Sequence, residues 1–201
     1  VRAKRRVLGN SVVGLLGSGM SVGKDDYNYA IGGDAVLRKG ASQLIAQGGM
    51  SNRNGKQGWA FSSGYRGFNK GLLTMGAYEA VGDSFDVQDI GFVPWAGRQK
   101  VTFITGPYWN FRTGPVQEMY AAAGLARTRD PGSPRWSTLG YLSLNPNLRS
   151  RWGGNLEVTF GRNYEYDDIK GRYAGYYYRG FDFGLWGLLR GNNVNANCSY
   201  S

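Results

Sequence analysis

Alternation of apolar and polar residues is the feature that most constrains the fold of this chain. In residues 155–164, NLEVTFGRNY, the residues Leu156, Val158 and Phe160 occupy every second position, and polar or small residues lie between them. Because successive side chains of a strand point to opposite faces, this spacing predicts a strand with one apolar and one polar face. One such strand leaves open whether its apolar face looks into a protein core or out into lipid.

The same period recurs along the chain and predicts eleven strands. The composition agrees, because 33 glycines and 29 aromatic residues (9 Phe, 6 Trp and 14 Tyr) suit many short strands and turns, whereas disordered chains lack aromatics. Residues 116–128 also have helix propensity, but Gly124 argues against a helix there. The expected strands cover residues 6–21, 27–38, 41–50, 59–66, 71–80, 99–111, 116–128, 136–144, 151–164, 172–189 and 192–201.

The connections between these strands alternate between longer, charged loops and tighter turns. The longest one, residues 81–97, is expected to be exposed at a rim that carries the long loops. This alternation is typical of an up-and-down antiparallel barrel in an outer membrane. A soluble sandwich with Greek-key connections has no reason to show it.

The polar faces and the aromatic residues favour a membrane setting. The polar faces carry Asn, Gln, Ser, Thr, Gly and scattered charges, as the lumen of a barrel would. Aromatic residues gather near both ends of the strands, where the two interfaces of a membrane would lie. They are Tyr27, Trp59, Trp136, Tyr164 and Tyr173 near the long loops, and Tyr65, Trp109, Trp152 and Trp186 near the short turns. We therefore expect an all-β, up-and-down antiparallel transmembrane β-barrel, with residues 1–201 as a single barrel region whose apolar side faces lipid.

The residue types argue against an enzyme. The chain has no histidine, which removes every histidine-based triad and the usual zinc sites, and Cys198 is its single cysteine. No serine or aspartate comes with a recognisable base. The sequence therefore predicts no catalytic, cofactor-binding or metal-binding residues. The net charge of +10 permits nucleic acid or anionic lipid as a partner and does not choose between them.

Two motifs resemble known binding sequences and depart from them. Residues 17–24, GSGMSVGK, look like a phosphate loop, but Ser18 stands where glycine is needed and Asp25 where serine or threonine is needed. Residues 179–186, RGFDFGLW, overlap an RNA-binding signature whose fold also needs two helices, which the pattern does not predict. We read both stretches as glycine-containing strands and expect no nucleic acid partner.

Acidic residues in the longest loop raise the possibility of calcium binding. Asp83, Asp86 and Asp89 are spaced by three, and Glu79 lies just before them. Calcium takes oxygen ligands, but the order of ligands in the twelve-residue calcium loop is absent. A solvated acidic loop is the preferred interpretation.

Basic residues in or beside the strands bear on transport. Arg38, Arg66, Lys100 and Arg162 would favour anions in an open pore. Arg162 has the parity of Phe160 and would therefore face lipid. A lipid-facing position is compatible with its charge only if the side chain extends toward the rim of the barrel.

Residues 78–103, YEAVGDSFDVQDIGFVPWAGRQKVTF, resemble part of a known family. The pattern matches at Gly82 and Phe85 and again at residues 91–93, and the stretches KRRVLGNSVVGLL and GGDAVLR are similar to the start of the same region. The family is an uncharacterised group of bacterial outer-membrane β-barrels whose members carry a family-9-like carbohydrate-binding domain before the barrel. That domain is absent here, and the resemblance supplies no catalytic residues.

The resemblance implies a pore or surface scaffold in the bacterial outer membrane, and it suggests a link to carbohydrate uptake or binding. Its expected partners are the lipid bilayer and lipopolysaccharide, the barrel-assembly machinery, and oligo- or polysaccharide. The odd number of strands and an end at Ser201 within an alternating stretch indicate an incomplete barrel of 10–11 strands from a longer chain. The alternatives are a soluble all-β module that binds polysaccharide or nucleic acid through a basic aromatic face, and a membrane-embedded enzyme or calcium-dependent binder built on the long loops.

Overall fold

The computed structural model describes residues 1–23, 25–88, 95–189 and 192–200, and this part of the chain holds strands and connections without helices. The strands are β1 (Arg2–Val7), β2 (Ser11–Ser21), β3 (Tyr27–Lys39), β4 (Ser42–Arg53), β5 (Lys56–Asn69), β6 (Leu72–Val81), β7 (Gln99–Asn110), β8 (Val116–Arg129), β9 (Ser137–Leu148), β10 (Gly153–Asp167), β11 (Arg172–Leu189) and β12 (Asn192–Tyr200). The expected strand at 116–128 is therefore present as β8, against its helix propensity.

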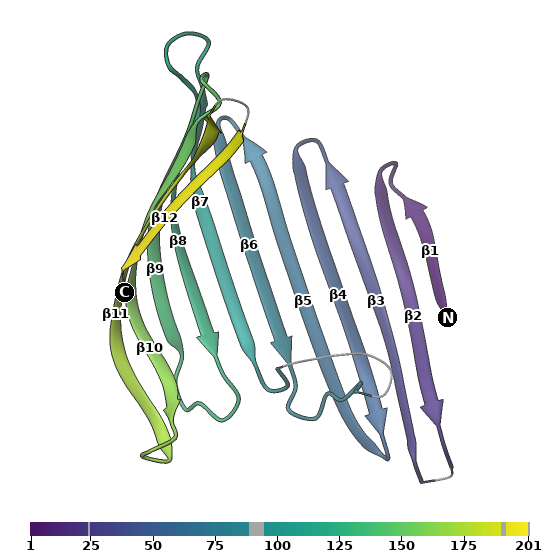
Figure 1. Ribbon diagram of the computed structural model, residues 1–201. Coiled ribbons are helices and arrows are strands. Elements are labelled where there is room, and N and C mark those ends of the chain that lie inside the picture. Colours follow the sequence, from purple (N-terminus) through teal and green to yellow (C-terminus); the bar gives the residue numbers. More distant parts are fainter. Residues whose placement is uncertain (24, 89–94, 190–191, 201) are drawn as a thin grey trace. The chain divides into compact units, whose positions relative to one another are not determined.

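Each strand pairs with its neighbours in the chain, so the strand order runs from β1 to β12 in one antiparallel sheet (Figure 1). The expected all-β, up-and-down antiparallel fold is confirmed. β1 and β12 are the two edge strands of this order, so the described sheet is not closed on itself. Contacts divide the chain into two compact units, which are described separately below. Unit 1 comprises Val1–Gly67, Met75–Val101 and Thr128–Pro134, and unit 2 comprises Phe68–Thr74, Thr102–Arg127 and Arg135–Ser201.

The strand expected at residues 6–21 is in fact two strands, and the expected count of eleven was wrong. Leu8 and Gly9 have φ angles of 47° and 74°, and they reverse the chain between β1 and β2. Arg2 therefore pairs with Leu16 across the hairpin. Glycine adopts positive φ readily, which is the physical reason that the turn forms inside an apolar run. With twelve strands described, an odd count no longer argues for missing strands.

The connection expected at residues 51–58 is a two-residue turn. Asn54 and Gly55 have φ angles of 51° and 84°, and β4 ends at Arg53 while β5 begins at Lys56. Positive φ at both central residues is the signature of a type I′ hairpin, which favours Asn-Gly. The regular alternation of long and short loops fails here, and the longest connections are residues 82–98 and 130–136.

The apolar face of unit 2 is built from rows of side chains on neighbouring strands. Leu142, Val158 and Phe181 form one row, and Leu144, Leu156 and Phe183 form the next. Val158 is 40% exposed and Phe160 is 48% exposed, whereas the intervening Thr159 is less exposed than either. The two-residue alternation is as predicted, and its apolar positions are the more exposed ones.

Unit 1 has the same arrangement. Ile31, Met50 and Trp59 form a row across β3, β4 and β5, with exposures of 66%, 58% and 49%. On the opposite face, Asp34 pairs with Gln47. Unit 1, like unit 2, therefore has an exposed apolar face on one side of its strands and a polar face on the other.

Large apolar side chains do not form a core in the described part of the chain. Its buried hydrophobic residues are Ala80, Val87 and Ala122. Its buried polar residues are Ser11, Asn28, Ser51, Ser133 and Ser137. Soluble domains bury Leu, Ile, Val and Phe and expose polar residues, so burial in these units is inverted.

The aromatic residues expected at the strand ends are mostly on the apolar face, with one clear exception. In unit 1, Tyr27, Trp59 and Tyr65 share the face of Ile31 by strand parity. Trp186 lies on the polar face instead, where its indole nitrogen would be 2.5 Å from a Cβ added at Gly153. Trp186 therefore does not belong to an outward-facing aromatic row.

Candidate functional site: a loop packed on the polar face

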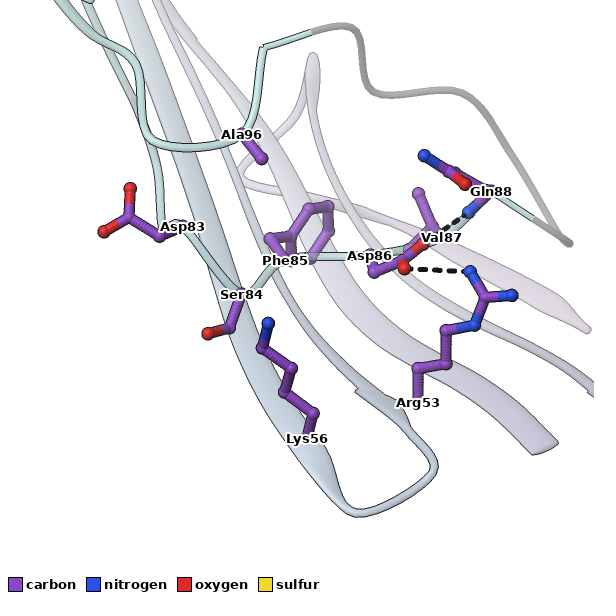
Figure 2. A pocket seen from close by; sticks show the side chains of 9 residues that line it. All are labelled: Arg53, Lys56, Asp83, Ser84, Phe85, Asp86, Val87, Gln88 and Ala96. Carbon is purple, nitrogen blue, oxygen red and sulfur yellow. Dashed lines mark hydrogen bonds and ion pairs between the residues drawn. The ribbon is translucent and has the colours of Figure 1, made fainter. Parts of the chain in front are cut away.

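The connection after β6 folds back onto the polar face of the β4–β5 hairpin in unit 1 (Figure 2). A Cβ added at Gly58 of β5 would overlap the backbone of Phe85, so the loop reaches this strand only because residue 58 is glycine. The Gly82 backbone N–H donates to the Trp59 carbonyl at 2.8 Å. We call residues 82–88 the packed segment.

Asp86 anchors the packed segment to β4. Its backbone N–H donates to the Ser51 hydroxyl at 3.0 Å, and its carboxylate pairs with the Arg53 guanidinium at 2.9 Å. The Gln88 backbone N–H donates to the other carboxylate oxygen at 3.0 Å. These contacts make Asp86 a structural anchor whose oxygens are already occupied.

The hydrogen bond from Gln88 and the one from Arg53 lower the pKa of Asp86 below its usual value. Both partners stabilise the carboxylate over the protonated acid. The anchor is therefore ionised at neutral pH, and it stays ionised to a lower pH than an ordinary aspartate.

A cleft of about 240 Å³ lies between the packed segment and the hairpin. Its lining includes Lys56, Asp83 and Ser84 along with the Arg53–Asp86 pair, as Figure 2 shows. The walls are mostly charged and polar, with Phe85, Val87 and Ala96 as their apolar part, which suits water or a small polar solute.

The described acidic residues of this region, Glu79, Asp83 and Asp86, do not come together as a metal site. Asp86 is paired with Arg53, and Glu79 is an exposed residue within β6. The Asp83 carboxylate lies against Gly97, since a Cβ added at Gly97 would overlap it. Asp89 lies outside the described residues. Among the described residues, no group of three or more His, Cys, Asp or Glu is placed to hold a metal ion.

The expectation that residues 81–97 form an exposed loop holds for only part of that segment. Val87 is buried and Asp86 is half-buried against the hairpin, whereas Trp95 is 56% exposed. The glycine at position 58 was the available signal, since a glycine inside a strand often marks a close backbone approach.

The phosphate-loop-like stretch falls in β2 and the turn after it. β2 ends at Ser21, and the Val22 backbone N–H donates to the Asp26 carbonyl at 2.9 Å, which closes a turn that leads directly into β3. A phosphate loop requires a helix after the glycines. Lys24 lies outside the described residues.

The stretch that resembles an RNA-binding signature is part of β11. Phe181 and Phe183 lie on the apolar face, and Asp182 between them lies on the polar face opposite Glu157. The described part of the chain supplies neither of the two helices that the RNA-binding fold packs against its sheet.

The four basic residues predicted to influence transport divide between the faces. Arg38 and Arg66 both pair with Gln43, and Arg38 Nε donates to its side-chain oxygen at 3.2 Å. Lys100 has the polar-face parity of β7, so Arg38, Arg66 and Lys100 lie on the polar face, which also carries Arg53. Arg162 lies on the apolar face, where its guanidinium is 5.0 Å from the ring centre of Tyr164 and 5.8 Å from that of Tyr177.

Unit 2 carries a hydrogen-bonded network on its polar face. The Tyr108 hydroxyl donates to Glu118, and the Asn147 side-chain amide donates to the other oxygen of Glu118 at 2.9 Å. The Tyr141 hydroxyl donates to the Phe103 carbonyl at 3.5 Å. Hydrogen-bonded polar groups of this kind suit a face that meets water or encloses polar side chains.

A comparison of the chain with protein-family models, curated proteins and solved structures found no match. The resemblance drawn from residues 78–103 therefore stays a prediction. In the part of the chain that the structure describes, no helix is long and apolar enough to cross a membrane.

Proposed function

We propose that the chain is part of a non-catalytic β-barrel of the bacterial outer membrane that acts as a pore or a surface scaffold. The observation that carries the proposal is the inverted alternation. Leu156, Val158 and Phe160 are all more exposed than the polar residues between them. Lipid is the surrounding that makes such a face favourable, because exposed apolar area is costly in water.

Several features support the same proposal. The strand order is that of an up-and-down barrel, and the polar network of unit 2 is on the face that would line a lumen. The lengths also fit, because spanning strands need roughly 9–11 residues and β2 has 11 residues while β9 has 12. The link to carbohydrate rests on the resemblance alone and stays a hypothesis.

The test uses two single-cysteine variants of the full chain in a Cys198→Ser background. An environment-sensitive fluorophore is attached at position 158 or at position 159 after folding into lipid vesicles. We expect a blue-shifted emission that a lipid-soluble quencher reduces at position 158, and an emission that a water-soluble quencher reduces at position 159.

The soluble alternative predicts a different result. A soluble module that binds polysaccharide or nucleic acid would stay in solution without detergent and would leave both fluorophores insensitive to a lipid-soluble quencher. That result would overturn the membrane proposal.

A further inference from the structure

In β8–β11 of unit 2 the carboxylates lie on one face, and the arginines other than Arg172 lie on the other. By strand parity, Arg127, Arg162 and Arg179 lie on the apolar face, and the described residues of these strands place no carboxylate there. The carboxylates of these strands are all on the polar face. They are Glu118, Glu157, Glu165, Asp167 and Asp182.

Aromatic rings orient two of these arginines, Arg127 and Arg162. Arg162 lies over Tyr164 and Tyr177, and the guanidinium of Arg127 is 5.2 Å from the ring centre of Trp136. Arg135, in the connection before β9, lies 5.9 Å from the ring centre of Tyr164. Rings orient a guanidinium through cation–π attraction but leave its positive charge intact.

Two further observations support a built site. Gly175 carries no side chain, and a Cβ added there would be 2.5 Å from the Tyr164 ring and 3.2 Å from Arg162 Nε, so both groups lie across this position. Among the described residues, Arg127, Arg162 and Arg179 make no ion pair. These three arginines, here called the cationic cluster, therefore present positive charges that no described carboxylate neutralises through an ion pair.

An open apolar groove lies farther along the same strands. It has a volume of about 430 Å³, and its lining includes Ala121, Ala123, Leu142 and Val158. Arg162 is four residues from Val158, which is about 13 Å at roughly 3.3 Å per residue of strand. The distance between the apolar groove and the arginines is thus one that a single lipid can span, with its acyl chain at one end and its headgroup at the other.

We propose that this face of unit 2 binds an anionic membrane lipid, with an acyl chain in the groove and the phosphate between Arg127, Arg135 and Arg162. Arg179 adds positive charge beside Phe160 in the same face. Guanidinium groups bind phosphate through paired, charge-assisted hydrogen bonds, and charge complementarity selects an anionic headgroup over a zwitterionic one. This inference rests on the proposed membrane function and names one lipid site on that surface.

The experiment measures lipids that stay bound to the full chain. The protein is purified in detergent micelles that contain equal amounts of phosphatidylglycerol and phosphatidylcholine, and native mass spectrometry then gives the ratio of the two lipids retained. We expect the native chain to retain mainly phosphatidylglycerol. Arg127→Gln and Arg162→Gln should each lower the ratio by up to about fivefold, which corresponds to about 1 kcal/mol per basic residue near an anionic bilayer.

Control variants separate the site from general charge. Arg38→Gln and Arg66→Gln remove the same charge from the polar face, and they should leave the ratio unchanged. A native chain without preference, a preference that survives the double variant Arg127→Gln/Arg162→Gln, or equal losses in the controls would overturn the site. Displacement of the lipid by millimolar inorganic phosphate would show a soluble anion site and would also overturn it.

Failure of the underlying function gives a separate result. A chain that stays folded and soluble without detergent would refute the membrane proposal, and the lipid site with it. A chain that requires detergent but shows no phosphatidylglycerol preference would refute only the lipid site.

Discussion

Substitutions at positions 158 and 159 test the membrane proposal most directly, because the two side chains are adjacent in β10 and lie on opposite faces. Val158 lies between Leu142 and Phe181 on the apolar face, and Thr159 lies between Tyr141 and Gly180 on the polar face. Val158→Arg should lower the free energy of unfolding by about 2–4 kcal/mol, the cost of an arginine in the lipid-facing surface at mid-membrane. Thr159→Arg should cost much less, because its side chain would enter the aqueous lumen of the proposed barrel and not the lipid.

The surroundings of the two residues set these magnitudes. The Thr159 hydroxyl is 3.4 Å from the Glu157 carboxylate, so an arginine at position 159 would enter a face that already carries negative charge. At position 158 the neighbours are aliphatic and aromatic, and they offer no hydrogen-bond partner for a guanidinium.

A third variant separates lipid from a protein core. In a packed core, Val158→Leu would force an extra methylene into occupied space and cost about 1–3 kcal/mol. Val158 is 40% exposed and borders the open groove, so the extra methylene has room, and we expect a change within about 0.5 kcal/mol.

The assay is reversible unfolding by denaturant in lipid vesicles, followed by tryptophan fluorescence, with the native chain as reference. Equal losses for Val158→Arg and Thr159→Arg would refute the assignment of the two faces. A loss above about 1 kcal/mol for Val158→Leu would indicate a packed neighbour in place of lipid.

Three further predictions concern the packed segment and the polar face. Gly58→Ala should release the packed segment and speed its cleavage by protease. Gly64→Ala in the same strand should not, because a Cβ at position 64 meets only ordinary contacts. Equal cleavage rates in the two variants would contradict the close approach of the packed segment to Gly58. The pKa of Asp86 is lowered by folding, so the contribution of this carboxylate to stability is complete above the usual aspartate pKa and is lost as the pH falls through the lowered value. Cleavage of the packed segment by protease, measured between pH 5 and pH 2, should therefore increase below about pH 4. In Asp86→Asn the cleavage rate should no longer depend on pH in this way. The polar face carries carboxylates as well as Arg38 and Arg66, so Arg38→Gln and Arg66→Gln should shift the reversal potential of an open pore toward cation preference, and no shift, or no conductance, would rule this out.

The sequence predicted the fold class and the two faces of the strands because both depend on local pattern. A two-residue period assigns Leu156, Val158 and Phe160 to one face whatever the surroundings, and the structure confirms that assignment. Turn geometry was less accessible, because Leu8 and Gly9 interrupt an apolar run that reads as continuous. The Asn54–Gly55 turn carried a strong signal, and the polar residues on both sides of it made the connection look longer than it is.

The packed segment was not predictable from local pattern, because it depends on contacts between distant residues. Asp86, in the connection after β6, pairs with Arg53 at the end of β4, and the regular spacing of the aspartates gave no indication of that partner. The same holds for the arginine cluster of unit 2. The stacking of Arg162 on Tyr177 follows from the register between β10 and β11, which fixes the two residues as direct neighbours.

Pairing of each strand with its neighbours in the chain has a consequence for how such a protein changes over time. A hairpin such as β10–β11 carries its own internal pairing and pairs with the rest of the sheet through its two outer edges. If one hairpin were duplicated or lost, the strands on either side of it would again pair antiparallel, and the pairings elsewhere in the sheet would stay as they are. The strand order thus makes a hairpin the natural unit of gene duplication, through which related sheets gain or lose width two strands at a time.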